Sequence, residues 1–363
     1  MRIGIDIRAL SQPHCGIGSH TLNLVKNLLQ LDRQDQFYLY TCREFDAGSL
    51  SRYPNIVIRK TYFPNGTLWA QTILPFQIAR DRIDVFHSPE SMVPIRGRVP
   101  SIVTVHDLTT FIFPKESDKK ARSAARLYPW VFGKAKKITA DSKNTKADIM
   151  RLFKIGPDKI EVIPSAFDAN AYYPDKKIKS VLDKYDIKQP YILTVGVISP
   201  RKNINRLIQA CGIVQQKRPV SLVIAGPEGW GHKETIEQAH RAGAVVTGAL
   251  PVEELRALYN GASVFAYPSV YEGFGIPILE AMACQTPVVA SEASSIPEVV
   301  DDAGLLFDPN DPAAIAAAIE KVMSDASLAA SLVAKGNERI RQFSWQAVAS
   351  KTLELYREVA QGK

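Results

Sequence analysis

The sequence has few cysteines and no long apolar run. Its four cysteines, Cys15, Cys42, Cys211 and Cys284, include no Cys-x-x-Cys pair. This excludes a disulfide framework and a zinc site of the usual spacing, so we expect reduced, mostly packed thiols. No stretch of about 18 apolar residues is present, and the opening "MRIGIDIRAL" is typical of a strand. We therefore expect no membrane span, no signal peptide and a cytoplasmic location.

Motifs for nucleic-acid binding are also absent, although the chain is basic. The net charge is +8, and residues 1–180 hold 28 Lys and Arg against 17 Asp and Glu, while the remaining residues hold 17 against 20. A basic half attracts phosphorylated small molecules or an anionic membrane face. Without a helix-turn-helix, zinc-finger or aromatic RNA-binding signature, we expect no nucleic-acid partner.

Length and periodicity predict two α/β domains. A chain of 363 residues, 46% of them hydrophobic, is too long to fold around one ordinary hydrophobic core. Short β-branched runs alternate with helical patterns twice, which indicates two doubly wound parallel sheets that bind ligands at the carboxyl ends of their strands. The charged stretch 165–190 is the expected linker. The expected strands are "RIGIDIR", "FYLYT", "NIVIR", "DVFHS", "SIVTVH", "KITAD" and "IEVIP", then "YILTVG", "SLVIAG", "AVVTG", "SVFAYP", "PVVAS" and "GLLF".

The stretch "YEGFGIPILEAMACQTPVVAS" at 271–291 places two glutamates around a glycine turn. Gly273 and Gly275 let the backbone turn and approach a ligand, just before a helix whose amino end favours phosphate. This fits a nucleotide whose diphosphate lies on the loop, with its ribose near Glu280 and an attached sugar near Glu272. The alternative is a helix cap at Glu272 and a solvated Glu280. The backbone N–H groups of Phe274, Gly275 and Ile276 are expected to donate hydrogen bonds to the phosphates.

Two further strand ends carry candidate residues. In "VGVISPRKN", Gly196 precedes Arg201 and Lys202, cations that can stabilise a departing nucleoside diphosphate or are simply surface charges. In "SIVTVHDLTTF", His106 follows a strand and is either a site residue or a packed histidine. Asp107 orients His106 or caps the next segment, and the sequence does not decide between these.

Taken together, these motifs resemble retaining glycosyltransferases of family 4, whose signature is Glu, seven residues, Glu. "GIDIRALSQPHCGIGSHTLNLVKNL", "VHDL", "LVIAGP" and "SSIPEVVDDAGLLFDP" also follow the family's order, so the resemblance covers nearly the whole chain. Bacterial mannosyltransferase-like members are the most similar. The resemblance implies a GT-B fold of two Rossmann-like domains facing a central cleft: an acceptor-side domain at 1–170, a donor domain at 171–343, and a helix at 344–363 crossing back to the first domain.

The resemblance also implies roles for the candidates. Arg201 and Lys202 hold the donor's phosphates, and His106 contacts the donor sugar near the reacting carbon. The loop with Gly16 and Gly18 passes close to the diphosphate and helps define the acceptor pocket. Here "GIGSH" departs from the family pattern of Arg and then an aromatic residue, which leaves the acceptor contacts open. A second departure is Gln285 in place of glycine, expected to alter packing.

The predicted activity is transfer of a hexose, with GDP-mannose favoured as donor, to a saccharide or lipid-linked saccharide with retained configuration. No Asp-x-Asp motif is present, so we expect no cofactor and no required metal, with Arg201 and Lys202 in the cation's role. Without an obvious carboxylate nucleophile, the leaving phosphate is expected to take the acceptor's proton while Glu272 orients the sugar. The alternatives are an epimerase or hydrolase of the same fold and a catalytically silent nucleotide-sugar-binding partner.

The stretch 116–137, "ESDKKARSAARLYPWVFGKAKK", mixes basic and aromatic residues. A solvated helix with a packed face is one interpretation. If the acceptor is lipid-linked, this is where we expect peripheral contact with the inner membrane face.

Overall fold

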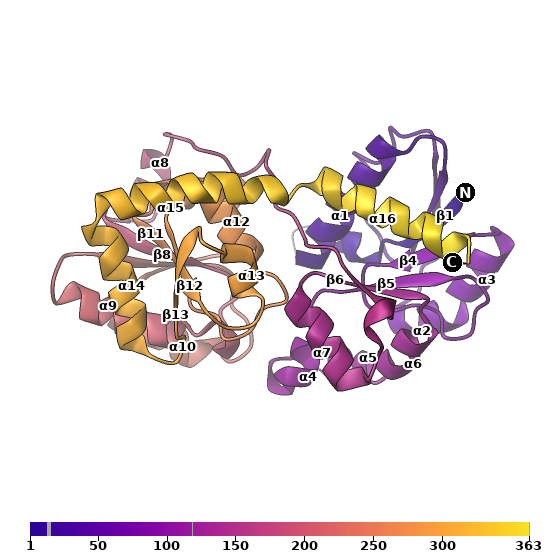
Figure 1. Cartoon of the computed structure of the whole chain (residues 1–363), viewed down its shortest axis with the longest axis horizontal. Coiled ribbons are helices and arrows are strands. Elements are labelled where there is room, and N and C mark those ends of the chain that lie inside the picture. Colours follow the sequence, from indigo (N-terminus) through magenta and orange to yellow (C-terminus); the bar gives the residue numbers. More distant parts are fainter. Residues whose placement is uncertain (13–15, 118, 363) are drawn as a thin grey trace. The chain divides into compact units, whose positions relative to one another are not determined.

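The computed structural model describes residues 1–12, 16–117 and 119–362 and divides the chain into two units (Figure 1). Unit 1 comprises Met1–Thr110, Asp118–Ser165 and Ser344–Lys363, and unit 2 comprises Phe111–Ser117 and Ala166–Phe343. Pro13 to Cys15 of the first glycine loop lie outside the described residues. Within the described residues, no helix is both long and apolar enough to cross a membrane.

Unit 1 is built on a seven-stranded parallel sheet of order β3-β2-β1-β4-β5-β6-β7. The strand order reverses between β1 and β4, which is the switch point where such sheets bind ligands. The strands are β1 (Arg2–Asp6), β2 (Gln36–Thr41), β3 (Ile56–Lys60), β4 (Val85–Ser88), β5 (Ser101–Val105), β6 (Lys137–Ala140) and β7 (Ile160–Val162). The helices are α1 (Gly16–Leu31), α2 (Gly66–Thr72), α3 (Leu74–Arg80), α5 (Lys119–Ala125), α6 (Tyr128–Lys134), α7 (Lys143–Phe153) and α16 (Trp345–Ala360), while α4 (Thr109–Ile112) spans the boundary with unit 2.

The last helix, α16, belongs to unit 1 and packs on α1. Ser344 caps it by accepting the N–H of Ala347, and its apolar face buries Tyr356. The Tyr356 hydroxyl lies 2.6 Å from Nδ1 of His87 on β4, so the helix is bonded as well as packed against the sheet.

Unit 2 is built on a six-stranded parallel sheet of order β10-β9-β8-β11-β12-β13. Its switch point lies between β8 and β11. The strands are β8 (Tyr191–Val195), β9 (Ser221–Ala225), β10 (Val245–Gly248), β11 (Val264–Tyr267), β12 (Val288–Ser291) and β13 (Gly304–Phe307). The helices are α8 (Lys179–Lys184), α9 (Ile204–Gln215), α10 (His232–Arg241), α11 (Val252–Gly261), α12 (Ile276–Ala283), α13 (Ile296–Val300), α14 (Pro312–Ser324) and α15 (Ala326–Arg339).

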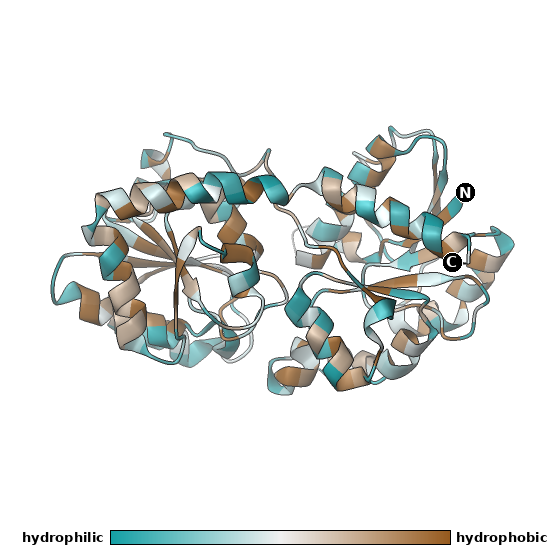
Figure 2. Ribbon diagram, in the orientation of Figure 1, coloured by the Kyte–Doolittle hydropathy of each residue, from teal (hydrophilic) through white to brown (hydrophobic). Residues whose placement is uncertain are grey.

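Both faces of the unit 2 sheet are covered, so its strands are apolar almost throughout (Figure 2). Side chains alternate between faces along a strand. Leu193 therefore joins the core under α11 and α12, while its neighbour Ile192 joins the core under α9 and α14. The predicted α/β class with two doubly wound sheets is confirmed.

Candidate active site

The loops after β8 and β11 bring three predicted residues together at the switch point of unit 2. Arg201 and Lys202 follow β8 in a short 3-10 turn, Pro200–Lys202, and Glu272 follows β11. Because β8 and β11 are neighbours in the sheet, their carboxyl ends lie side by side. The strand order thus places two cations and a carboxylate in one cluster.

Both cations contact the same carboxylate. Arg201 Nη1 lies 2.8 Å from Glu272 Oε2, and Lys202 Nζ lies 2.6 Å from Oε1. Lys202 also donates to the Tyr267 hydroxyl at 3.0 Å. The three charged side chains are only 11–16% exposed. Two cationic side chains are thus held at one point in a region of low dielectric, where both can contact an anionic ligand.

Glu272 is firmly ionised by this arrangement. Burial opposes its charge, but Lys202 and Arg201 outweigh burial and lower its pKa to about 2. A carboxylate held by two cations is a weak base and a weak nucleophile. It is well suited to accepting hydrogen bonds from hydroxyl groups.

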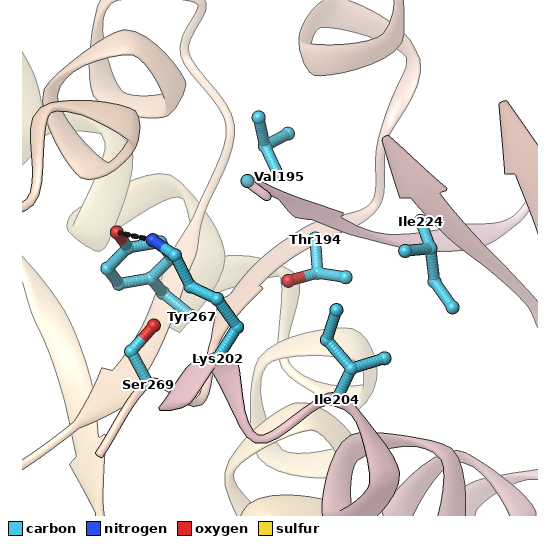
Figure 3. A pocket seen from close by; sticks show the side chains of 8 residues that line it. Thr194, Val195, Lys202, Ile204, Ile224, Tyr267 and Ser269 are labelled. Carbon is cyan, nitrogen blue, oxygen red and sulfur yellow. Dashed lines mark hydrogen bonds between the residues drawn. The ribbon is translucent and has the colours of Figure 1, made fainter. Parts of the chain in front are cut away.

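Gly196 is required by the position of Lys202. Its φ of +144° is rarely adopted by other residues, and a Cβ there would lie 3.1 Å from Lys202 Cε. The lysine stem is packed tightly among Thr194, Ile204 and Tyr267 (Figure 3), in a space with no room for water. Lys202 therefore presents its charged end from a fixed position.

The glycine turn before α12 is held by hydroxyl groups from the segment after β12. Ser295 Oγ lies 2.9 Å from the carbonyl oxygens of both Glu272 and Phe274, which share its one hydrogen, and Ser294 Oγ donates to the Glu272 carbonyl at 2.6 Å. Gly275, with φ of +120°, precedes the first helical residue, Ile276. The loop that presents Glu272 is thus rigidly built.

Glu280 lies on α12 in a different environment from Glu272. Its Oε2 accepts the Tyr259 hydroxyl at 2.9 Å, and Tyr172 also bonds to it. Burial raises the pKa of Glu280 to about 7, against the opposing effect of the two tyrosines. The two glutamates of the motif therefore differ, since one is held ionised by cations and the other exchanges its proton near neutrality.

Glu280 predicts a pH-dependent stability. Its pKa in the folded chain, about 7, exceeds its ordinary value of 4.5, so the folded state binds the proton more tightly. The resulting stabilisation is full below pH 4.5 and is lost as the pH rises through 7, a change of about 3 kcal/mol at 1.36 kcal/mol per unit. Urea unfolding at pH 5 and pH 8 should show this loss in wild type and not in Glu280→Gln, after subtraction of changes common to both. An equal pH dependence in the two proteins would contradict a raised pKa at Glu280. The control is Glu237→Gln, which changes an exposed glutamate on α10.

Glu116 is a member of this site that sequence reasoning missed. It lies in the Phe111–Ser117 segment, which packs with unit 2. Its Oε1 accepts the backbone N–H of Arg201 at 2.8 Å, and Oε2 lies 3.8 Å from Arg201 Nε. The stretch 116–137 showed only a mixture of basic and aromatic residues typical of an interfacial helix. That pattern carries no information about a contact between Glu116 and Arg201.

In unit 1, His106 follows β5 and bonds through both ring nitrogens. Nδ1 lies 2.8 Å from Oδ2 of Asp141, and Nε2 lies 3.0 Å from the Pro89 carbonyl. Asp107 does not orient the ring; its Oδ1 accepts the N–H of Thr109 at 2.8 Å and so caps the next segment. The question that the sequence left open is thereby decided, and Asp141 is a second residue that sequence reasoning missed.

His20 is packed inside unit 1, in contact with His106. The two rings meet edge-on at 4.6 Å, and Trp345 lies on another side of His20 at 5.2 Å. Burial, and secondarily His106 and His87, hold the pKa of His20 well below its usual range, so it is neutral. Gly18, two residues before His20, is required because a Cβ would lie 2.1 Å from the Gln12 carbonyl oxygen, whereas Gly16 has open space around it.

His20, His106 and Asp141 are close enough together, within 4.8 Å, for a metal ion to be considered. Both nitrogens of His106 are already bonded, one of them to a backbone carbonyl. These bonds account for the cluster, and we assign none of the three as a metal ligand.

Known proteins are similar to both halves of this chain in sequence and to the whole chain in fold. The family description "Glycosyltransferase Family 4" matches residues 15–171 and "Glycosyl transferases group 1" matches residues 176–339. O-antigen chain mannosyltransferase B of Escherichia coli is 32% identical, over 98% of this chain and 100% of that protein. Sucrose-phosphate synthase of Thermosynechococcus elongatus has a TM-score of 0.79 at 21% identity over 100% of both chains. HepE of Anabaena, solved with UDP and glucose, has a TM-score of 0.74 at 18% identity over 98% of both.

Two Rossmann-like units with these structural neighbours define the GT-B fold. The chain belongs to glycosyltransferase family 4. The family resemblance predicted from the motifs is confirmed.

Proposed function

We propose that the protein transfers mannose from GDP-mannose, with retained configuration, to a saccharide or lipid-linked saccharide in the synthesis of a cell-surface polysaccharide or glycolipid. The observation that carries this proposal is the buried cluster of Arg201, Lys202 and Glu272 at the switch point of unit 2. The similarity to a full-length O-antigen mannosyltransferase supports mannose as the sugar.

Arg201 and Lys202 are placed to act on the leaving diphosphate. A nucleoside diphosphate gains negative charge as its bond to the sugar breaks, and fixed cations in a dry site stabilise that charge without reorganising. Glu272 holds both cations in position while the site is free of ligand. With two cationic side chains in this role, we propose that transfer needs no divalent metal.

The state of Glu272 supports retention without a covalent intermediate. With a pKa of about 2 and both oxygens bonded to cations, Glu272 is a poor nucleophile toward the anomeric carbon. We propose that it orients a sugar hydroxyl instead. The acceptor's proton then passes to the departing phosphate oxygen on the same face of the sugar.

We place peripheral membrane contact on α5 and α6 of unit 1. Trp130 on α6 is 61% exposed, although Val131 and Phe132 beside it are buried. The predicted single stretch is two short helices, and Pro129 lies in the first turn of the second. A groove of about 640 Å³ adjoins α6 at Lys134, and five cations line it. They are Arg98, Lys134, Lys136, Lys137 and Lys159, and they outnumber the two carboxylates of the lining, Asp158 and Glu358.

This surface predicts binding to anionic vesicles. Each basic residue near an anionic membrane contributes about 1 kcal/mol, and salt screens the attraction. The protein should sediment with phosphatidylglycerol vesicles at low salt, and Trp130→Ala should weaken that binding several-fold. Trp230→Ala, at a 51% exposed position of unit 2, is the matched control. Equal binding to neutral phosphatidylcholine vesicles would contradict the assignment.

The test of the proposed activity is a transfer assay with product analysis. GDP-mannose and a mannose-containing acceptor should yield GDP in an acceptor-dependent way, and NMR of the product should show the donor's anomeric configuration. The rate should persist in a chelator. Acceptor-independent release of GDP indicates a hydrolase, a changed sugar without transfer indicates an epimerase, and no turnover with any nucleotide sugar indicates a binding partner; each outcome refutes the proposal.

A further inference from the structure

The pairing of His106 with Asp141 follows directly from the sheet. β5 and β6 are parallel neighbours whose last residues, Val105 and Ala140, are in register. The next residue on each strand is therefore His106 and Asp141, at the carboxyl edge. Their side chains are 17% and 8% exposed, so the 2.8 Å contact is largely shielded from water.

The partners of His106 determine its protonation. The Pro89 carbonyl can only accept a hydrogen bond, and an ionised carboxylate at Asp141 can only accept one too. Each ring nitrogen must then carry a proton, because a lone pair on either one would face an oxygen lone pair. A ring with protons on both nitrogens is an imidazolium cation.

The charges around His106 favour the same state. Burial opposes a cation, but the Asp141 carboxylate, with a smaller contribution from Asp107, raises the pKa of His106 above its ordinary value. The neighbouring imidazoles of His20 and His87 are neutral because burial holds their pKa low. The titratable groups that face His106 are His20 from α1, His87 and Glu90 from β4 and the loop after it, Asp107 from its own strand end, and Asp141 from the end of β6.

We propose that Asp141 is a positioning residue that holds His106 as a cation, with Nδ1–H bonded to Asp141 and Nε2–H bonded to the Pro89 carbonyl in the free protein. This role rests on the proposed glycosyl transfer. His106 then acts as a hydrogen-bond donor and a positive charge, not as a general base.

The transfer step balances without His106 taking a proton. The bond from the anomeric carbon to the diphosphate oxygen breaks, and the bond from that carbon to the acceptor oxygen forms. The acceptor's proton passes to the departing phosphate. The Nε2–H of His106, which bonds to Pro89 in the free protein, is exchanged from that carbonyl to an oxygen of the donor.

The direct test is nitrogen-15 NMR of the histidine rings in the full chain. The sequence has six histidines, and His106→Gln identifies the signal of interest. At pH 7.5 both nitrogens of His106 should be protonated, while His20 and His87 should each show one bare nitrogen. In Asp141→Asn the titration midpoint of His106 should fall by at least one pH unit, and Asp107→Asn, which removes the neighbouring capping carboxylate, should shift it less. A bare nitrogen on His106 at pH 7.5 in the wild type overturns the proposal even if Asp141→Asn does not fold.

A kinetic measurement separates this proposal from the proposed function. The pH above which kcat declines should fall in Asp141→Asn by as many pH units as the titration midpoint of His106 does. The KM for the donor should change less than kcat. An unchanged pH of decline overturns the positioning role. If no nucleotide sugar supports transfer, the proposed function fails, while the ring titration still decides whether Asp141 holds His106 as a cation.

Discussion

Replacing Arg201 and Lys202 together with alanine is expected to lower turnover roughly a thousandfold or more while weakening donor binding only about tenfold. Loss of one preorganised electrostatic contact to a developing charge costs about a hundred- to a thousandfold, and in the proposed mechanism these two groups act on the same leaving group. Their effect is larger in the transition state than in the bound donor, because the diphosphate gains charge as the bond breaks.

The matched control is the adjacent pair Lys217 and Arg218. These residues belong to the same unit and pair with Glu320. Their double alanine variant should keep near wild-type turnover. Because removal of Arg201 and Lys202 leaves the Glu272 carboxylate buried without a cation, thermal unfolding must show that the variant is folded at the assay temperature. Equal losses in binding and turnover would mean that the cations only hold the donor.

His106→Ala is expected to lower transfer by roughly a hundredfold or more and to leave nucleoside diphosphate affinity nearly intact. In the proposed mechanism the lost group is a positioned hydrogen-bond donor to the sugar, so its removal should affect the transition state more than the binding of the nucleotide. Single-turnover rates and calorimetric titration of GDP measure the two effects separately. His240→Ala, at an exposed position near the end of α10, is the control. A wild-type rate in His106→Ala would remove this residue from the mechanism.

The fold was predictable because the alternation of strands and helices is local information. The contact between Glu272 and the cations was harder to predict, since it depends on β8 and β11 being neighbours although two strands, β9 and β10, lie between them in sequence. That pairing is a property of the doubly wound order, which brings together strands that are not consecutive in the chain.

Asp141 was within reach of sequence reasoning. Consecutive strands pair about two times in three, so "VTVH" and "KITAD" were expected neighbours with polar residues at the same edge. The tyrosines that bond to Glu280 were not within reach. Tyr259 lies inside helix α11 and Tyr172 in an irregular segment, and nothing in their spacing relates them to the motif.

The most direct test of the central claim, that the two-glutamate loop of unit 2 is the nucleotide site, is calorimetric titration of GDP into wild type and Glu280→Ala. The titration is made at pH 8, where Glu280, with its pKa of about 7, is mostly ionised. If Glu280 accepts the ribose hydroxyls, the variant loses charge-assisted hydrogen bonds of roughly 1.5 to 3 kcal/mol, and affinity should fall about ten- to a hundredfold. Glu237→Ala, at a 69% exposed side chain, should bind as wild type does. Identical GDP affinity in wild type and Glu280→Ala would contradict the account.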